Sequence, residues 1–149
     1  MSDQHQTVVV RPWYRQFYLQ RGDAEWCSDR ISDDGYARGL EAIDGFVYVG
    51  TTMYGSPTEI VVGVHVEDPG LHGSADRHVD AILGGDGDLE VLNWEPGEPP
   101  VTTVGLPSGT LALRASWFDT AAAAEHHDVE SGGDDRSPEH IALDLWPAP

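Results

Sequence analysis

The fold class of this chain is decided by residues 58–67, which read Thr58-Glu59-Ile60-Val61-Val62-Gly63-Val64-His65-Val66-Glu67. Side chains alternate between the two faces of a β-strand, so the apolar residues at positions 60, 62, 64 and 66 fall together on one face. Half of the opposite face is polar. This pattern predicts a half-buried strand.

The same alternation recurs along the chain. In Thr110–Phe118 the side chains predicted to point inward are Leu111, Leu113, Ala115 and Trp117, and residues 141–145 repeat the pattern. Further apolar runs lie at 7–11, 13–19, 46–49, 79–83, 89–94 and 101–106, separated by turn-forming segments such as 84–88 and 107–109. Such punctuated short strands predict an all-β sandwich or barrel, and we favour an antiparallel β-sandwich of about eight short strands.

Two stretches depart from the alternation. Residues 28–42 are compatible with one short, irregular helix that Gly35 and Gly39 weaken. Residues 119–138 hold an alanine run followed by histidines and carboxylates, with no apolar face to bury, and predict a long acidic loop. The length of 149 residues suits one domain, so we assign residues 1–149 to a single β-sandwich domain.

The charge balance is extreme. The chain has 26 acidic residues against eight basic ones, all arginine, for a net charge of −18. The lack of lysine excludes Schiff-base chemistry and the lysine-dependent phosphate loops. Such acidity disfavours nucleic acid and membrane surfaces and favours a basic protein as partner. The acidity alone is equally compatible with salt adaptation, genome composition or simple solubility.

Other sequence features bear on location and cofactors. Cys27 is the lone cysteine, which rules out an intrachain disulfide. The first residues lack the pattern of a secretion signal, and no stretch approaches the ~20 apolar residues of a membrane span. We therefore expect a soluble cytoplasmic protein, and the sequence indicates no cofactor.

Histidines are the candidate metal ligands. His126, His127 and His140 are compatible with zinc or manganese, although their spacing matches no established ligand pattern. Whether they bind metal stays open. Cys27 would act as a nucleophile only with a histidine beside it, and the chain lacks the Gly-x-Ser-x-Gly sequence of a serine nucleophile.

Several short motifs resemble the competence protein J family, small bacterial proteins whose best-known kind inhibits a DNA-entry nuclease. The similar segments are Tyr14-Arg15-Gln16-Phe17-Tyr18, Trp26 with Ser28-Asp29, Asp44-Gly45, Leu106-Pro107-Ser108-Gly109 and the closing Ile141–Pro147. The likeness runs from about residue 8 to the end. Trp26 and Asp29 lie one residue further apart than in the family pattern, and the 119–138 segment is longer. The resemblance implies a β-sandwich and a protein partner, and we carry no catalytic residues over from it.

Charge and resemblance together favour a non-enzymatic, intracellular protein-binding module, an inhibitor or immunity-type partner of a nuclease or other basic protein. Its carboxylates would imitate substrate phosphate. The residues that we select for partner binding are Asp128, Glu130, Asp134 and Asp135, with Trp117 or Tyr54 as aromatic anchors. Two alternatives stay open: a structural or accessory domain whose acidity only provides solubility, and a small metal-dependent hydrolase that uses the scattered histidines.

Overall fold

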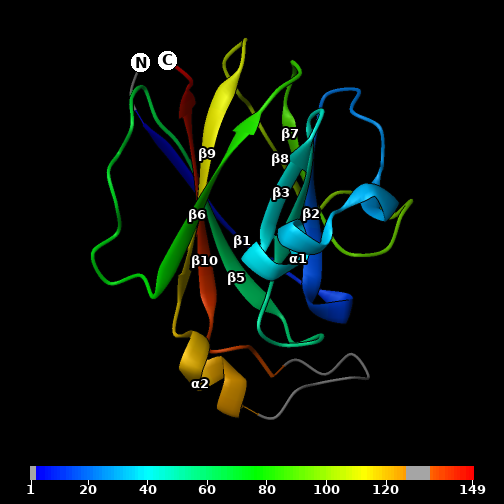
Figure 1. Ribbon diagram of the computed structural model, residues 1–149, viewed down its shortest axis with the longest axis vertical. Coiled ribbons are helices and arrows are strands. Elements are labelled where there is room, and N and C mark those ends of the chain that lie inside the picture. Colours follow the sequence, from blue (N-terminus) through cyan, green and yellow to red (C-terminus); the bar gives the residue numbers. More distant parts are fainter. Residues whose placement is uncertain (1–2, 127–134) are drawn as a thin grey trace.

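The computed structural model describes residues 3–126 and 135–149 and contains two five-stranded sheets there. The first sheet runs in the order β1 (Gln4–Val10), β5 (Thr58–Val64), β10 (His140–Pro147), β9 (Leu111–Phe118) and β6 (Arg77–Leu83). The second runs β3 (Leu40–Ile43), β4 (Phe46–Gly50), β2 (Gln16–Arg21), β7 (Leu89–Leu92) and β8 (Thr102–Val104). Figure 1 shows the sheets as two layers. The prediction of an all-β chain is confirmed, with ten strands where about eight were expected.

The strand formed by the stretch that decides the fold class lies beside the C-terminal strand in the first sheet. Residues 58–64 form β5, and β10 pairs with it in parallel, with Val62 opposite Leu143. The expectation of purely antiparallel pairing is wrong here. The strand β10 lies between β9 and β5 and pairs antiparallel with β9. In this direction it runs parallel to β5.

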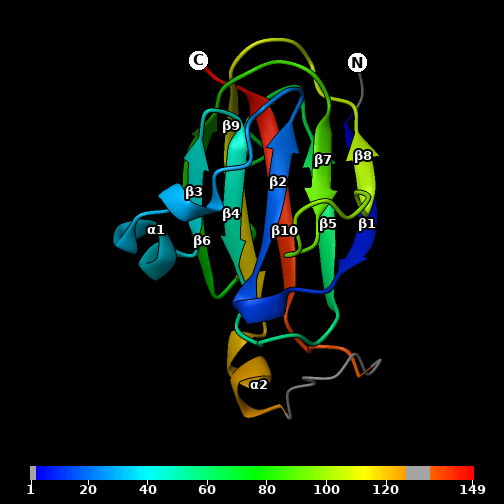
Figure 2. The ribbon, with the colours of Figure 1, turned by 90° about the vertical axis from the view of Figure 1, so that its right-hand side faces the viewer.

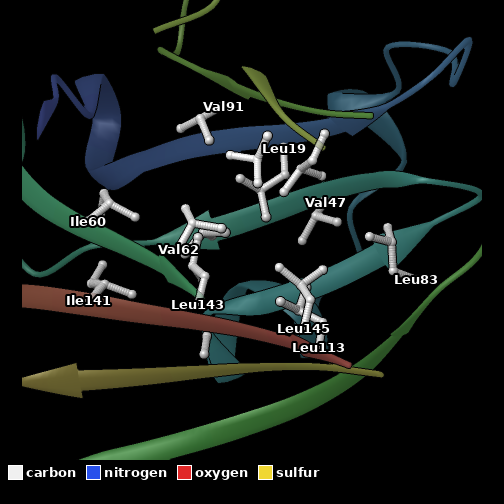
Figure 3. Close-up of a cluster of buried hydrophobic side chains, with 14 of the residues drawn as sticks. Leu19, Val47, Ile60, Val62, Leu83, Val91, Leu113, Ile141, Leu143 and Leu145 are labelled. Atoms are coloured by element: carbon white, nitrogen blue, oxygen red, sulfur yellow. The ribbon is translucent and has the colours of Figure 1, made fainter. Parts of the chain in front are cut away.

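One hydrophobic core joins both sheets. Figure 3 shows Leu19, Val47 and Val91 of the second sheet facing Val62, Leu113 and Leu143 of the first. The inward face predicted for β9 is confirmed, because Leu111, Leu113, Ala115 and Trp117 are all fully buried. Burying each valine or leucine side chain of this core stabilises the fold by roughly 1.5–3 kcal/mol, and this contribution holds the layers together.

The segment predicted as a strand over 13–19 begins instead with the turn η1 (Trp13–Arg15), and β2 starts only at Gln16. Tyr14 and Arg15 both adopt left-handed backbone angles, with φ of 57° and 63°. Such angles break the alternation of a strand, so Trp13 does not share a face with Phe17 as the pattern suggested.

The helix expected over 28–42 is shorter than predicted. The turn η2 (Ser28–Arg30) precedes α1 (Asp33–Arg38), which begins at the Ser32 cap and ends at Gly39 with φ of 85°. A left-handed glycine terminates helices readily, and here it releases the chain into β3. Leu40 is therefore buried as a strand residue rather than a helical one.

The acidic 119–138 stretch is not a loop throughout. Residues 120–125 form the helix α2 (Thr120–Glu125), because alanine is the residue that best tolerates helical backbone angles. No helix within the described ranges is long and apolar enough to cross a membrane.

A buried arginine organises the end of the molecule opposite α2 (Figure 1). Arg21, at the end of β2, is 1% exposed, and its guanidinium donates hydrogen bonds to the carbonyl oxygens of Gly87 at 3.1 Å, Gly109 at 2.8 Å and Pro107 at 2.8 Å. These carbonyls belong to two separate turns. Backbone carbonyl dipoles thus satisfy the donors, the exposed Asp86 carboxylate lies 4.0 Å from the guanidinium, and the turns are fixed to the end of β2.

Candidate functional site

A pocket of about 560 Å³ lies where η1 meets the chain that follows β7. Five residues line it: Trp13 and Tyr14 of η1, Tyr54 from the connection between β4 and β5, and Trp94 and Glu95 after β7. We call these five residues the aromatic pocket. Figure 2 shows η1 and the chain after β7 on the face of the second sheet that is turned toward the viewer.

The four rings of the aromatic pocket contact one another. The ring centroid of Tyr14 lies 4.6 Å from that of Trp94 and 5.0 Å from that of Tyr54, and Trp13 lies 5.9 Å from Tyr54. The rings meet at angles between 49° and 71°, the tilted and edge-to-face arrangements that aromatic quadrupoles favour. Each ring is therefore held in a fixed orientation by its neighbours.

Tyr14 has a strained backbone conformation that places its side chain at the surface. A left-handed angle at a non-glycine residue costs roughly 1–2 kcal/mol, and Tyr14 and Arg15 adopt it in succession. The conformation is locked because the Arg15 amide donates to the Tyr54 carbonyl at 3.2 Å and the Thr51 amide donates to the Arg15 carbonyl at 2.9 Å. Tyr14 is 54% exposed as a result. Such strain persists where the surroundings impose it, and it clusters at functional sites.

Arg11 ties together the segments that form the pocket. Its amide donates to Asn93 Oδ1 at 2.9 Å, and its guanidinium donates to the Gly55 carbonyl at 3.3 Å. The same guanidinium lies 5.8 Å from the centroid of the Trp13 ring. These contacts join η1 to the connections that carry Tyr54 and Trp94, so the pocket is formed before any partner arrives.

Apart from the aromatic pocket, a polar cluster lies on the outer face of the first sheet. His65 Nε2 lies 2.7 Å from Asp144 Oδ1, His65 Nδ1 lies 3.0 Å from Asp3, and His72 Nε2 lies 2.8 Å from Asp144 Oδ2. Burial opposes the charged form of His65, but the hydrogen bonds to both carboxylates outweigh it and raise the pKa of this histidine. The cluster fastens residue 3 and the connection after β5 onto the sheet.

On the same outer face, Arg114 of β9 is buried although it alternates with the core-facing side chains of that strand. Arg114 donates to Asp80 at 2.8 Å, to Asp68 at 3.2 Å and to the Gly70 carbonyl at 3.1 Å. Asp68 and Gly70 belong to the connection between β5 and β6, which therefore lies over the sheet. This face is held by ion pairs rather than left to solvent.

Two buried groups, the Cys27 thiol and the Ser116 hydroxyl, lack the surroundings of a nucleophile in the described part of the chain. The Cys27 thiol is buried, and burial raises its pKa, which is the reverse of what a reactive thiolate needs. The buried Ser116 hydroxyl has no hydrogen-bond partner among the described residues. A serine nucleophile requires a base within hydrogen-bonding reach.

The predicted partner-binding residues divide into three groups. Tyr54 lies in the aromatic pocket. Trp117 is fully buried in the core, where its indole donates to the Gly50 carbonyl at 2.9 Å, so the expectation that it anchors a partner does not fit its position. Asp135 is exposed and accepts a hydrogen bond from His126, while Asp128, Glu130 and Asp134 lie outside the described residues.

The described end of the acidic stretch lies close to the aromatic pocket. The Ser137 amide donates to the Pro57 carbonyl at 2.9 Å, which ties this stretch to the connection that carries Tyr54. Arg136 lines a smaller neighbouring pocket together with Arg11 and Asn93. The fold therefore brings Asp135 and Tyr54 to the same end of the molecule.

The histidines suggested as metal ligands are dispersed. His126 Nε2 lies 3.1 Å from Asp135, His140 stacks on Phe118 with ring centroids 4.4 Å apart, and His127 lies outside the described residues. Within residues 3–126 and 135–149, no three histidine, cysteine, aspartate or glutamate side chains are placed to hold a metal ion.

Comparison with solved structures places this architecture among known proteins. The chain matches the crystal structure of ComJ from Bacillus subtilis, an inhibitor of the DNA-degrading activity of NucA, with a TM-score of 0.70 over 99% of this chain and 100% of that chain. The chain has the ComJ fold. A second match is crocagin biosynthetic gene J, with a TM-score of 0.68 and coverage of 99% of both chains.

Sequence identity to ComJ and to the second protein is 13%, so the likeness shows the fold alone. No protein-family model matches the chain, and no curated protein matches its sequence. The resemblance to the competence protein J family is thus confirmed at the level of structure.

Sequence analysis missed most of the aromatic pocket. Trp13 and Tyr14 were placed on a strand, although Pro12 directly before them is a signal that a strand starts later. The pattern puts Trp94 at the end of the predicted strand 89–94 and gives Glu95 no role. Because the four rings come from separate segments, their convergence depends on the pairing of β2 with β4 and β7, which the sequence does not show.

Proposed function

We propose that this chain is a non-enzymatic β-sandwich that binds another protein, as an inhibitor or immunity-type partner of a nuclease or other basic protein. The observation that carries the proposal is the aromatic pocket, whose exposed ring is held by strained backbone. Rigid aromatic groups are the side chains that most often anchor protein interfaces. A pocket formed in advance also lowers the entropy cost of binding.

The charge supports a basic partner. At a net charge of −18 the chain attracts cationic surfaces and accelerates encounter, while the aromatic pocket supplies short-range affinity. Carboxylates that occupy the phosphate-binding groove of a nuclease would block its substrate. We assign this role to Asp128, Glu130, Asp134 and Asp135, since the described end of their segment approaches the pocket.

The structural similarity to ComJ indicates which kind of partner to test first. ComJ inhibits the DNA-degrading activity of NucA, and this chain shares its fold over nearly the full length. By extension, a nuclease is the first partner to test, even though the two sequences share little identity.

The test uses the tagged chain as bait in an extract of the organism that makes it, at physiological and at raised salt. We expect a basic protein to be retained at both, and its cleavage of plasmid DNA to fall in proportion to added chain. The Trp94→Ala variant should lose both effects. Three results together would contradict this proposal: retention is lost at raised salt, none of the retained proteins is a nuclease that the chain inhibits, and the variant retains the same proteins as the wild type. The accessory-domain alternative would then replace it.

A further inference from the structure

Arginine lies over tryptophan repeatedly in this protein. The guanidinium carbon of Arg77 lies 3.7 Å from the Trp117 ring centroid, and that of Arg114 lies 5.0 Å from the Trp146 ring centroid. Arg11 and Trp13 repeat the arrangement at 5.8 Å. A planar guanidinium over an indole gains from both stacking and the negative face of the ring. Three of the five tryptophans are paired in this way, whereas Trp26 packs against the rings of Tyr18 and Phe46.

Trp94 differs from these three tryptophans. It is half-buried, contacts the ring of Tyr14, and carries no arginine over its ring among the described residues. Glu95, the next residue, is exposed and is the one acidic side chain in the lining of the pocket. Aromatic ring faces beside a carboxylate are an environment that binds organic cations, and Trp94 with Glu95 offers it next to the Trp13 ring that Arg11 already faces.

We propose that the aromatic pocket binds a guanidinium group, the side chain of an arginine on the partner. This inference rests on the proposed function and names what the partner inserts. The pocket volume of about 560 Å³ accommodates a long side chain. Glu95 can accept charge-assisted hydrogen bonds from the guanidinium, and the rings of Trp94 and Tyr14 can pack against its planar faces.

Charge decides between the possible occupants. A neutral aliphatic side chain would gain from the rings but would make no charge-assisted hydrogen bond with the exposed Glu95 carboxylate. A second copy of this chain would bring a further −18 charge to the interface, and the two copies would repel. A cationic side chain from a basic protein satisfies both the rings and the carboxylate.

The test is a titration of the isolated chain with N-acetyl-arginine amide, followed by NMR at the indole N–H signals. The neutral probe is the citrulline analogue, which has nearly the same shape but no charge. We expect saturable shifts at Trp94 and Trp13 and an apparent Kd about fivefold lower for arginine than for citrulline, corresponding to a cation–π gain of ~1 kcal/mol. The buried Trp117 signal should stay unchanged and reports that the fold is intact.

Two variants test the assignment. Glu95→Gln should reduce the preference for arginine over citrulline, and Glu67→Gln, which removes the same charge from an exposed site after β5, should leave it unaltered. Equal shifts from both probes, or equal effects of the two variants, would overturn the guanidinium assignment. The two proposals can fail separately. If the extract experiment captures a partner but both probes give equal shifts, the proposed function stands and the guanidinium assignment fails. If the pocket prefers arginine but no partner is captured, only the proposed function is contradicted.

Discussion

The rings of Tyr14 and Trp94 lie 4.6 Å apart although one precedes β2 and the other follows β7. The two strands are antiparallel neighbours, with Tyr18 opposite Leu92, so the start of β2 and the end of β7 lie at the same end of the sheet. Strand pairing therefore builds the pocket. Any change that shifts this register would separate the rings.

Replacing Arg15 with glycine should raise the melting temperature. Glycine adopts the left-handed angle of 63° without the steric cost borne by arginine, and the gain of about 1 kcal/mol corresponds to roughly 2–4 °C for a chain of this size. Thermal unfolding followed by circular dichroism measures it. Arg38→Gly, in the last turn of α1, is the control and should lower the melting temperature. A lower value for Arg15→Gly would contradict the strain argument.

Replacing Arg21 with alanine should destabilise the chain by at least about 3 kcal/mol, because buried carbonyls of two turns would lose their donors. Arg21→Lys should recover little, since a single ammonium cannot reproduce the planar fork of donors. Urea unfolding of both variants checks this expectation. A loss below about 1 kcal/mol would show that water replaces the guanidinium without penalty.

How far the sequence predicts this fold depends on whether the signal is local. β5, β9 and β10 were predicted because alternation identifies a strand and its inner face. The alternation also placed Trp117 in the core, which should have excluded it as an anchor. The run of alanines at 121–124 favours the helix α2, but the acidic residues that follow and the lack of an apolar face are typical of a loop, so the pattern of 119–138 as a whole predicts a loop.

Features made by separate segments could not be predicted in this way. Arg21 resembles any strand-end arginine until the turns at 84–87 and 107–109 fold over it. His65 and His72 are scattered in the sequence, and only the position of Asp144 on β10 brings them together. The aromatic pocket belongs to the same class of feature.

The cluster around His65 predicts a pH dependence of stability. A pKa raised in the folded chain contributes stability that is complete below the ordinary histidine value of 6.5 and is lost as the pH rises through the folded value. The wild-type chain should therefore lose stability across that window relative to His65→Gln, which cannot titrate. Urea unfolding across this pH range measures the difference. A constant difference between the two proteins would exclude a charged His65 in the fold.

Neutralising the acidic segment tests the steering role. Exchanging four carboxylates for amides should weaken binding of the captured basic partner and flatten its salt dependence, because electrostatic attraction is screened by salt. The positions are Asp128, Glu130, Asp134 and Asp135.

The matched control removes the same number of charges elsewhere. It changes four exposed carboxylates outside the pocket lining, namely Asp23, Glu25, Asp29 and Glu67. Affinity should fall more for the acidic segment than for the control, as measured by titration at two salt concentrations. An equal fall would assign the effect to net charge rather than to this segment.

The most direct test of the account is site-specific photo-crosslinking in the native host. A benzoylphenylalanine is placed at Tyr14, which is 54% exposed in the aromatic pocket, or at Tyr36, which is 45% exposed on α1. The helix α1 contacts β3, and strands β4 and β2 separate β3 from β7 in the second sheet. The two sites therefore sample different parts of the surface. We expect a covalent adduct with one basic protein from position 14 and none from position 36. No adduct from position 14, or the same adducts from both positions, would contradict it.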